Sequence, residues 1–310
     1  MVNQEGVDAM SVAEQKRWFI AATSIFVVLM IIAGCWDLQI SRHFIDYNSI
    51  FGTLFQTLGE FPVYMVLVLS GEIAMAYGLR NRVNGLFSGS LVIGGFALSI
   101  WQLQKYLSEI ESYSLAIQDN VHRHRPIGLA NSDSSEAGLN LVITYAILIF
   151  TYIVVTLLLQ YWLYHKTAQQ IKQLLIVSVF ASLTVLLAYE ANIALKQAWG
   201  RVRPYELNTT QSDFTAWYQI NGPNGHLSFP SGHSMAATLM IVFAWFTTGK
   251  WHRYIWGFGI GYAVLMYVSR VRIGAHFMSD TVFSGFLTFL IIYIIWELYK
   301  TVIASSNQLE

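Results

Sequence analysis

Charged side chains are scarce in this chain of 310 residues. Asp, Glu, Lys and Arg make up 12% of the sequence, which is about half the usual share of a globular domain. The 18 basic residues balance the 18 acidic ones. A soluble enzyme of this length needs more polar surface, and a nucleic-acid-binding protein carries a net basic field. We therefore expect neither class of protein, and the high apolar content also excludes a disordered chain.

Cysteine is nearly absent as well. The only cysteine, Cys35, lies within an apolar run. One thiol cannot form a disulfide framework within the chain, and it cannot form a cysteine-based zinc site.

Hydrophobic residues, by contrast, make up 55% of the sequence and gather in long runs. A helix needs about 20 residues to cross the hydrocarbon of a bilayer. Eight runs qualify once the sixth and seventh are extended as helix through 231–235 and 269–273. The runs do not alternate, and lipid offers no partner for unpaired backbone groups, so we predict helices. They cover residues 18–35, 61–79, 86–103, 139–164, 171–195, 235–248, 255–267 and 282–298.

These runs predict an all-α fold, a polytopic transmembrane helix bundle of about eight spans with mostly short loops. Two interpretations fit the longer segment 105–120, an amphipathic helix at the membrane interface or an ordinary exposed loop. Two acids, Glu72 and Glu190, fall inside spans, and we expect each to be paired within the bundle. Glu190 is close enough in sequence to Lys196 to brace it.

The distribution of Lys and Arg predicts the orientation. With the N-terminus inside, the loops on each side of the membrane hold nine basic residues. Five of the outer nine crowd into 196–203 and 270–272, where we expect a binding site to hold them. The remaining bias places both termini in the cytoplasm of a multi-pass protein of the cytoplasmic membrane.

Three polar clusters stand at the ends of predicted spans. Residues 196–204 leave the fifth run, 229–234 begin the sixth, and 269–280 lie between the seventh and eighth. Polar groups near a bilayer are costly and are usually functional. All three clusters fall on the outer side of the membrane, so they can meet in space.

The clusters carry groups that suit a bound anion. Lys196, Arg203 and Arg270 supply positive charge, and guanidinium groups match the paired oxygens of a phosphate. The Pro-Ser-Gly segment at 230–232 precedes a helix whose free N–H groups can point at an anion, and Ser231 adds a hydroxyl donor. These features predict an oxyanion-binding site.

Two histidines would add reactivity to that site. His276 lies one helical turn before Asp280, whose carboxylate can accept from one ring nitrogen and leave the other as a nucleophile or base. His233 lies beside the expected anion, where it can protonate a leaving oxygen. Taken one at a time, each basic residue can be interpreted as a topological anchor, and each histidine can be interpreted as a capping or solvated group. Together they predict covalent phosphoryl transfer through a phosphohistidine.

The three clusters resemble the signature of the type 2 phosphatidic acid phosphatase (PAP2) superfamily. Lys-x6-Arg-Pro occurs at 196–204, Pro-Ser-Gly-His at 230–233 and Ser-Arg-x5-His-x3-Asp at 269–280, with every signature position filled. The resemblance begins at about residue 171, and residues 1–165 match only loosely. It implies a PAP2-like catalytic transmembrane core within 166–310, which holds the last four runs, and N-terminal transmembrane helices with outer interfacial segments within 1–165. The family's common layout has six spans, so the eight runs include two extra N-terminal spans.

The resemblance also implies a role for each signature residue. His276 would be the nucleophile, Asp280 its orienting partner and His233 the acid. The reaction would need no metal and no other cofactor, in agreement with the lack of a convincing carboxylate or histidine cluster. The phosphoryl group would be bound by Lys196, Arg203, Ser231, Gly232 and Arg270.

We expect an integral-membrane phosphatase that acts at the extracytoplasmic face on a lipid phosphate or diphosphate. Polyprenyl diphosphates, phosphatidic acid and phosphatidylglycerol phosphate all fit. The partners we expect are membrane lipids and this substrate, with no nucleic acid, and the sequence leaves the oligomeric state open. Two alternatives remain open. The same site could transfer the phosphoryl group to another lipid, or the protein could be a transporter or binding protein that only holds a lipid phosphate.

Overall fold

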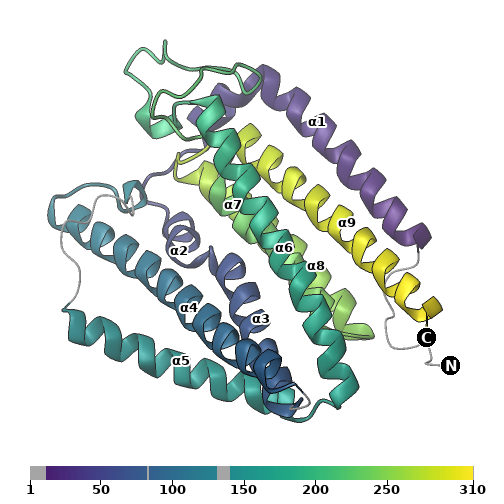
Figure 1. Ribbon diagram of the computed structural model, residues 1–310. Helices are drawn as coiled ribbons and strands as arrows, with labels where there is room; N and C mark the ends of the chain where they lie inside the picture. The colour runs from purple at the N-terminus through teal and green to yellow at the C-terminus, as the bar shows by residue number, and fades with distance from the viewer. Residues whose placement is uncertain (1–11, 82–83, 131–139, 310) are drawn as a thin grey trace.

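The computed structural model describes residues 12–81, 84–130 and 140–309. Within these ranges the chain consists of helices and loops without a strand, as the apolar runs predict (Figure 1). The helices are α1 (Val12–Phe44), α2 (Ile50–Leu58), α3 (Phe61–Arg80), α4 (Gly85–His122), α5 (Leu141–Tyr164), α6 (Ala168–Trp199), α7 (Gly232–Thr238), the 3-10 helix η5 (Leu239–Phe246), α8 (Lys250–Arg272) and α9 (Met278–Leu309).

Each of the eight predicted runs falls on helix over most of its length, and residue 139 of the fourth run lies outside the described residues. The sixth run corresponds to α7 with η5, a shorter apolar helix, and the seventh lies within α8, which carries basic residues at both ends. The described part of the chain contains six helical stretches long and apolar enough to cross a membrane, so the protein is a helical membrane protein. These are Ala13–Phe44, Ile50–Arg80, Gly85–His122, Leu141–Tyr164, Ala168–Glu206 and Met278–Ser305.

The segment 105–120 is helical. It continues the third apolar run without a break, because α4 extends over 38 residues from Gly85 to His122. Tyr113, Ala116 and Asn120 form its buried side. The interpretation as an exposed loop is therefore wrong, and the amphipathic helix is an extension of the span on the same axis (Figure 1).

Small residues bring α3 and α4 close together. A Cβ atom at Gly71 would lie 2.6 Å from the carbonyl oxygen of Gly95, and one at Gly78 would lie 2.6 Å from that of Ser88. Helices in membranes associate through such close backbone contacts, because lipid tails are as apolar as the side chains themselves. The largest hydrophobic core surrounds α3 and combines its side chains with those of α5, α6, α7, η5 and α9.

Glu72 is fully buried in α3 and is hydrogen-bonded by α5. Thr156 Oγ1 donates to its Oε1 at 2.8 Å, and Gln160 Nε2 donates to its Oε2 at 2.7 Å. The expectation that Glu72 is paired inside the bundle is confirmed. The same bonds attach α5 to the rest of the bundle, although most of its apolar side chains are exposed.

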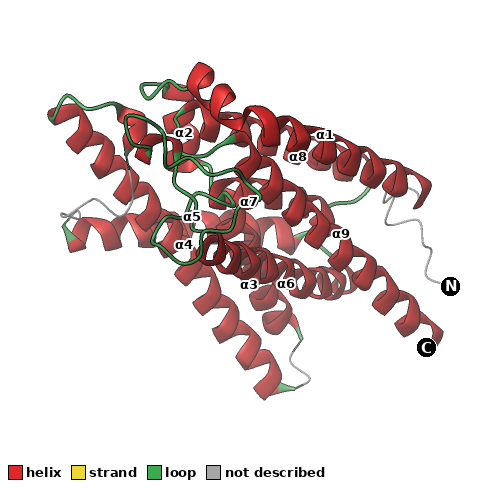
Figure 2. Ribbon diagram, turned by 90° about the horizontal axis from the view of Figure 1, so that it is seen from above, coloured by secondary structure: helices red, strands yellow, loops and turns green. Residues whose placement is uncertain are grey.

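The loops that follow α1, α6 and α8 lie at one end of the bundle, and the first residue of α1 and the last residues of α9 lie at the other (Figure 1). Figure 2 looks at the molecule from above and shows the loop segments crossing over the helices. The three polar clusters of the sequence belong to the loop end. The expected domain boundary at residue 165 stays a prediction.

Candidate active site

The three polar clusters meet where α6, α7 and α9 adjoin. Lys196 stands in the last turn of α6, Ser231 caps the first turn of α7, and Asp280 lies in the first turn of α9. The backbone N–H of Ser231 donates to the carbonyl of Asp280 at 3.1 Å. A Cβ atom on Gly232 would lie 3.7 Å from Lys196 Nζ, so α6 and α7 face each other across this glycine.

A left-handed glycine ends α6 and redirects the chain toward the site. Gly200 has φ +55° and ψ 40°, and its N–H donates to the carbonyl of Lys196. Glycine adopts this conformation without the steric penalty that other residues incur. A Cβ atom here would lie 2.0 Å from the carbonyl oxygen of Gly222, so the close approach of the following loop also requires glycine.

His276 lies in the turn between α8 and α9 and is 1% exposed. Its Nδ1 donates to the carbonyl of Ser228 at 2.7 Å. Because a carbonyl can only accept, this bond places the proton on Nδ1 and leaves the lone pair on Nε2. Burial lowers the pKa of His276 to about 3; Asp280 opposes the shift, and the Arg203 and Arg270 guanidiniums add to it. The ring is therefore neutral near pH 7, as a nucleophile must be.

The carboxylate of Asp280 accepts hydrogen bonds that hold the turn around His276. Its Oδ2 accepts from Ser228 Oγ at 2.6 Å and from the Phe277 N–H at 2.9 Å, and it lies 3.5 Å from His276 Nδ1. The sequence predicts Asp280 as the direct partner of His276. In the structure the carbonyl of Ser228 is the nearer acceptor, and Asp280 holds both that serine and the turn.

Arg201 pairs with the other oxygen of the same carboxylate. The side chain of Arg201 is completely buried, and its Nη1 lies 2.5 Å from Asp280 Oδ1. Its Nη2 lies 2.9 Å from Oδ2 of Asp37, a residue of α1. Arg201 belongs to the first polar cluster but fills no signature position, so the resemblance assigned it no role.

His233 is held by residues from the N-terminal half of the chain. Its Nδ1 lies 3.1 Å from Oε1 of Glu60, at the start of α3, and its Nε2 lies 3.0 Å from the carbonyl oxygen of Gln56 in α2. An oxygen atom thus lies beside each ring nitrogen, although burial and the nearby Arg270 guanidinium lower the pKa of His233. Tyr113 of α4 meets the ring edge to face, with 5.9 Å between the centroids.

The predicted phosphate ligands present donors near these histidines. Arg270 is 2% exposed, and its Nη1 donates to Oε1 of Gln56 at 3.0 Å. Its Nε is buried and has no hydrogen-bond partner among the described residues. Ser231 Oγ accepts from Ser234 Oγ at 2.9 Å, which leaves the proton of Ser231 for another acceptor. Lys196 Nζ donates to a backbone carbonyl at 3.3 Å.

Arg203 is partly accessible, with 20% of its side chain exposed. It lies 3.9 Å from the carboxylate of Glu206, in the η4 turn (Pro204–Glu206). Its guanidinium is near enough to His276 to lower the pKa of that ring, and its partial exposure puts it at the edge of the site. The structure thus brings together all eight residues that the sequence predicts.

Several further side chains of the site escaped the sequence analysis, namely Asp37, Gln56, Glu60 and Tyr113. The sequence predicts Arg201 at the site only as one of the crowded basic residues of 196–203, without a role of its own. The other four come from the poorly matched half of the chain, where no motif pointed to them. Glu190, by contrast, is exposed, and among the described interactions none links its carboxylate to Lys196. The expectation that it braces Lys196 finds no support.

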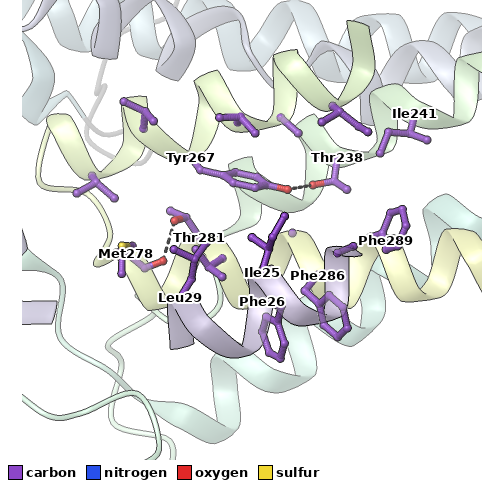
Figure 3. A pocket seen from close by; sticks show the side chains of 18 of the residues that line it. Ile25, Phe26, Leu29, Thr238, Ile241, Tyr267, Met278, Thr281, Phe286 and Phe289 are labelled. Carbon is purple, nitrogen blue, oxygen red and sulfur yellow. Dashed lines mark hydrogen bonds between the residues drawn. The ribbon is translucent and has the colours of Figure 1, made fainter. Parts of the chain in front are cut away.

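A cavity of about 500 Å³ lies between α1, α8 and α9, and it differs in character from the site. It is lined by apolar side chains such as Ile25, Phe26 and Phe286 (Figure 3). The hydroxyls of Thr238 and Tyr267, which also line it, are hydrogen-bonded to each other at 2.6 Å. The described residues that line the cavity include no histidine, carboxylate, lysine or arginine.

Among the described residues, no group of three or more His, Cys, Asp and Glu side chains could hold a metal ion. Comparison with known proteins gives one match. Residues 174–304 match the model of the PAP2 superfamily. No curated protein and no solved structure matches the chain.

Proposed function

Residues 174–304 belong to the PAP2 superfamily, and from this premise we propose that the protein is an integral-membrane lipid phosphatase. Members of the superfamily are phosphatases, so membership supports phosphatase activity in general. The finer proposal is hydrolysis of a lipid phosphate or diphosphate through a phosphohistidine. It covers polyprenyl diphosphates, phosphatidic acid and phosphatidylglycerol phosphate.

In the first step, the lone pair of His276 Nε2 attacks phosphorus, and the bond from phosphorus to the lipid oxygen breaks. The leaving oxygen takes a proton from His233, competing with the acceptors that hold this ring in the free protein. Throughout, His276 Nδ1 keeps its proton and donates it in the hydrogen bond to the carbonyl of Ser228, so the imidazole keeps its orientation while charge develops on it.

In the second step, water attacks the phosphohistidine. His233, now short of one proton, takes a proton from the water as the oxygen bonds to phosphorus. The bond between phosphorus and Nε2 breaks, its electron pair returns to His276, and inorganic phosphate leaves. Through both steps the charge on the transferring oxygens is stabilised by Lys196, Arg203 and Arg270.

One observation carries this proposal beyond family membership. Arg270 is buried with its Nε unpaired, next to a histidine whose free lone pair points away from its carbonyl partner. A buried guanidinium N–H without an acceptor is unfavourable, and a ligand can remove this cost by accepting its hydrogen bond. A phosphoryl oxygen is an acceptor that suits a guanidinium. The substrate would therefore complete a site that is otherwise left unsatisfied.

The position of the site supports the proposal that the substrate is a lipid. The reactive groups stand at one end of long apolar helices, which would place them at the level of lipid headgroups. A phosphate attached to a membrane-embedded chain is concentrated at that level. We propose that this end faces the outside of the cytoplasmic membrane, opposite both termini.

Phosphate release from purified protein tests the proposal. We expect wild-type protein in detergent with EDTA to release phosphate from at least one member of a lipid phosphate panel. His276→Ala is expected to lose turnover and the acid-labile phosphoenzyme formed from 32P-labelled lipid. His233→Ala is expected to be slowed by about 100-fold or more.

His252→Ala provides the matched control. His252 is also buried, and its Nδ1 is hydrogen-bonded to the carbonyl of Ala244 at 2.9 Å, away from the site. We expect this variant to keep its activity. Undiminished release by His276→Ala would refute the phosphohistidine mechanism. Transfer of label to an added lipid alcohol would indicate the phosphotransferase, and phosphate-dependent binding without release from any lipid would favour a binding protein or transporter.

A further inference from the structure

We propose that Asp37 of α1 is a positioning residue for the reaction, which acts through Arg201 on Asp280 and on the turn that carries His276. Asp37 lies outside residues 174–304, so the family match assigns it nothing. The inference rests on the proposed phosphatase function, and the experiments below separate the failure of one from the failure of the other.

The guanidinium of Arg201 is enclosed by protein groups. Nη2 donates to Asp37 Oδ2 at 2.9 Å, Nη1 donates to Asp280 Oδ1 at 2.5 Å, and Nε donates to the carbonyl of Thr215 at 2.9 Å. The ring centre of Phe277 lies 4.2 Å from Cζ. Asp37 is 2% exposed, and the other two charged side chains are fully buried. A buried guanidinium shared by two carboxylates has no water to replace a lost partner.

Asp37 also binds the first turn of α9 directly. The backbone N–H of Ser279 donates to Asp37 Oδ1 at 3.1 Å, and the Ser279 hydroxyl donates to Oδ2. Arg201 Nη1 donates to the same hydroxyl at 2.7 Å. The first N–H groups of a helix lack partners within it, so a carboxylate from α1 satisfies this helix start. Asp37 thus holds Ser279 and, through Arg201, the neighbouring Asp280.

Two short paths lead from Arg201 to the nucleophile. The carbonyl of Arg201 accepts from the N–H of Ser228 at 2.9 Å, and the carbonyl of Ser228 accepts from His276 Nδ1. On the side-chain path, Arg201 holds Asp280, whose other oxygen accepts from Ser228 Oγ. A shift of Arg201 would therefore displace the acceptor that fixes the orientation of His276.

Charge sharing adds to this geometric effect. Asp37 neutralises part of the positive charge of Arg201. Arg201 therefore compensates less of the negative charge of Asp280, and Asp280 acts more strongly on His276. The His276 ring becomes positive when Nε2 bonds to phosphorus, and a nearby carboxylate stabilises that charge. None of the described contacts of Asp37 involves Lys196, Arg203 or Arg270. Asp37 would therefore affect the chemical step more than substrate binding.

Packing between α1 and α9 keeps Asp37 in place. Phe26 of α1 stacks on Phe286 of α9 with 4.1 Å between the ring centroids, and Phe19 stacks on Tyr293 at 4.7 Å. These contacts involve residues that precede Asp37 in α1, and they do not involve the site. Because the two helices pack as a fixed pair, Asp37, the buried acid of α1, is held against the start of α9.

The test compares two buried acids of the N-terminal half. We expect Asp37→Asn to lower kcat by about tenfold to 100-fold and to change KM by less than about threefold, since supporting groups around a reactive site typically have effects of this size. Asp37→Glu, which keeps the charge, should recover part of the loss. The matched control is Glu72→Gln, which removes a fully buried carboxylate held by Thr156 and Gln160. Its kcat should stay within about twofold of wild type, as expected for a residue remote from the reaction.

Ser279→Ala covers the case in which Asp37→Asn does not fold, because it keeps both ion pairs of Arg201 and loses only the bridging hydroxyl. We expect kcat to fall by about threefold to tenfold with KM unchanged, as for the loss of one supporting hydrogen bond. Wild-type kcat in folded Asp37→Asn, or in Ser279→Ala where Asp37→Asn does not fold, would overturn the inference. An equal loss in Glu72→Gln would also overturn it.

A second readout does not depend on catalysis. In protein labelled with 15N-histidine, the Nδ1–H signal of His276 can be assigned by its disappearance in His276→Asn. We expect this signal to move in Asp37→Asn and Ser279→Ala and to stay in place in Glu72→Gln. If wild-type protein hydrolyses no lipid phosphate, the proposed function fails, and an unmoved signal in the first two variants would separately reject the role of Asp37.

Discussion

At the residue scale, the two histidines differ in the oxygen atoms that surround them. His276 has one close acceptor, the carbonyl of Ser228, which leaves Nε2 with its lone pair. His233 has an acceptor beside each nitrogen, and one of them is the carboxylate of Glu60. A neutral ring with a directed lone pair suits attack on phosphorus, and a ring beside a carboxylate can hold, once a phosphate is bound, the second proton that it passes to the leaving oxygen. The roles therefore follow from hydrogen bonding rather than from ring chemistry.

Glu60→Gln tests the second half of this argument. Without the carboxylate, His233 holds its extra proton less firmly, so we expect kcat for a lipid phosphate to fall by about tenfold to 100-fold. Hydrolysis of 4-nitrophenyl phosphate, whose leaving group needs no proton, should fall by less than about threefold. Steady-state kinetics with both substrates measures the contrast. Equal losses for the two substrates would show that Glu60 supports the site without assisting the acid.

At the scale of elements, helix ends place the reactive groups. The end of α6 supplies Lys196, the start of α7 supplies His233, and the turn before α9 supplies His276. The short helix α2 adds Gln56 from the other side. Helix ends suit this task because they expose unpaired backbone groups and can leave a side chain at the membrane surface. Their exact directions depend on the turns that follow them, above all on Gly200.

Gly200→Ala tests the dependence on that turn. A left-handed conformation disfavours alanine by about 1 to 2 kcal/mol, and the new Cβ would in addition meet the carbonyl of Gly222. We expect a lower unfolding temperature in detergent and a raised KM, because Lys196 and Arg203 flank the displaced residue. Gly225→Ala is the control, since Gly225 has φ +90° but no atom within 4 Å of a Cβ. It should lower stability only, and an equal rise of KM in both variants would contradict the argument.

At the scale of the whole molecule, the candidate site lies at one end of the bundle, and the first residues of α1 and the last residues of α9 lie at the other (Figure 1). If the long helices cross the membrane, the site and the termini must face different compartments. When the Lys and Arg residues of the site are not counted, the remaining basic residues are more numerous on the side of the termini. This distribution favours termini inside the cell. Lipid phosphates would then be hydrolysed at the outer surface.

Cysteine labelling tests this orientation. In a Cys35→Ser background, Ser212→Cys marks the loop after α6, and Gln169→Cys marks the opposite end, at the start of α6; both residues are exposed. We expect a membrane-impermeant maleimide to label Ser212→Cys in intact cells and Gln169→Cys only after permeabilisation. The reverse pattern would place the site in the cytoplasm.

Much of this protein could be predicted from local sequence. Long apolar runs require helices because lipid cannot satisfy a free backbone group, and each predicted run falls on a helix. The signature residues recur at fixed spacings, so Lys196, His233 and His276 could be assigned to one phosphate site before any geometry was known. Spacing along a helix also indicated that Asp280 lies beside His276. The sequence could not show that the carbonyl of Ser228 is the nearer acceptor, because a backbone contact leaves no trace in residue identity.

Only the tertiary structure decided what the N-terminal half contributes. Asp37 and Arg201 are 164 positions apart, and Gln56 and His233 are 177 positions apart, yet each pair is in hydrogen-bond contact. No periodicity or motif connects residues at such separations, and a single acid in an apolar helix fits many partners. Their meeting depends on how α1 packs on α9 and how α2 packs on α8. Local chemistry along the chain therefore determined the reactive groups, and helix packing determined which buried side chains hold them in place.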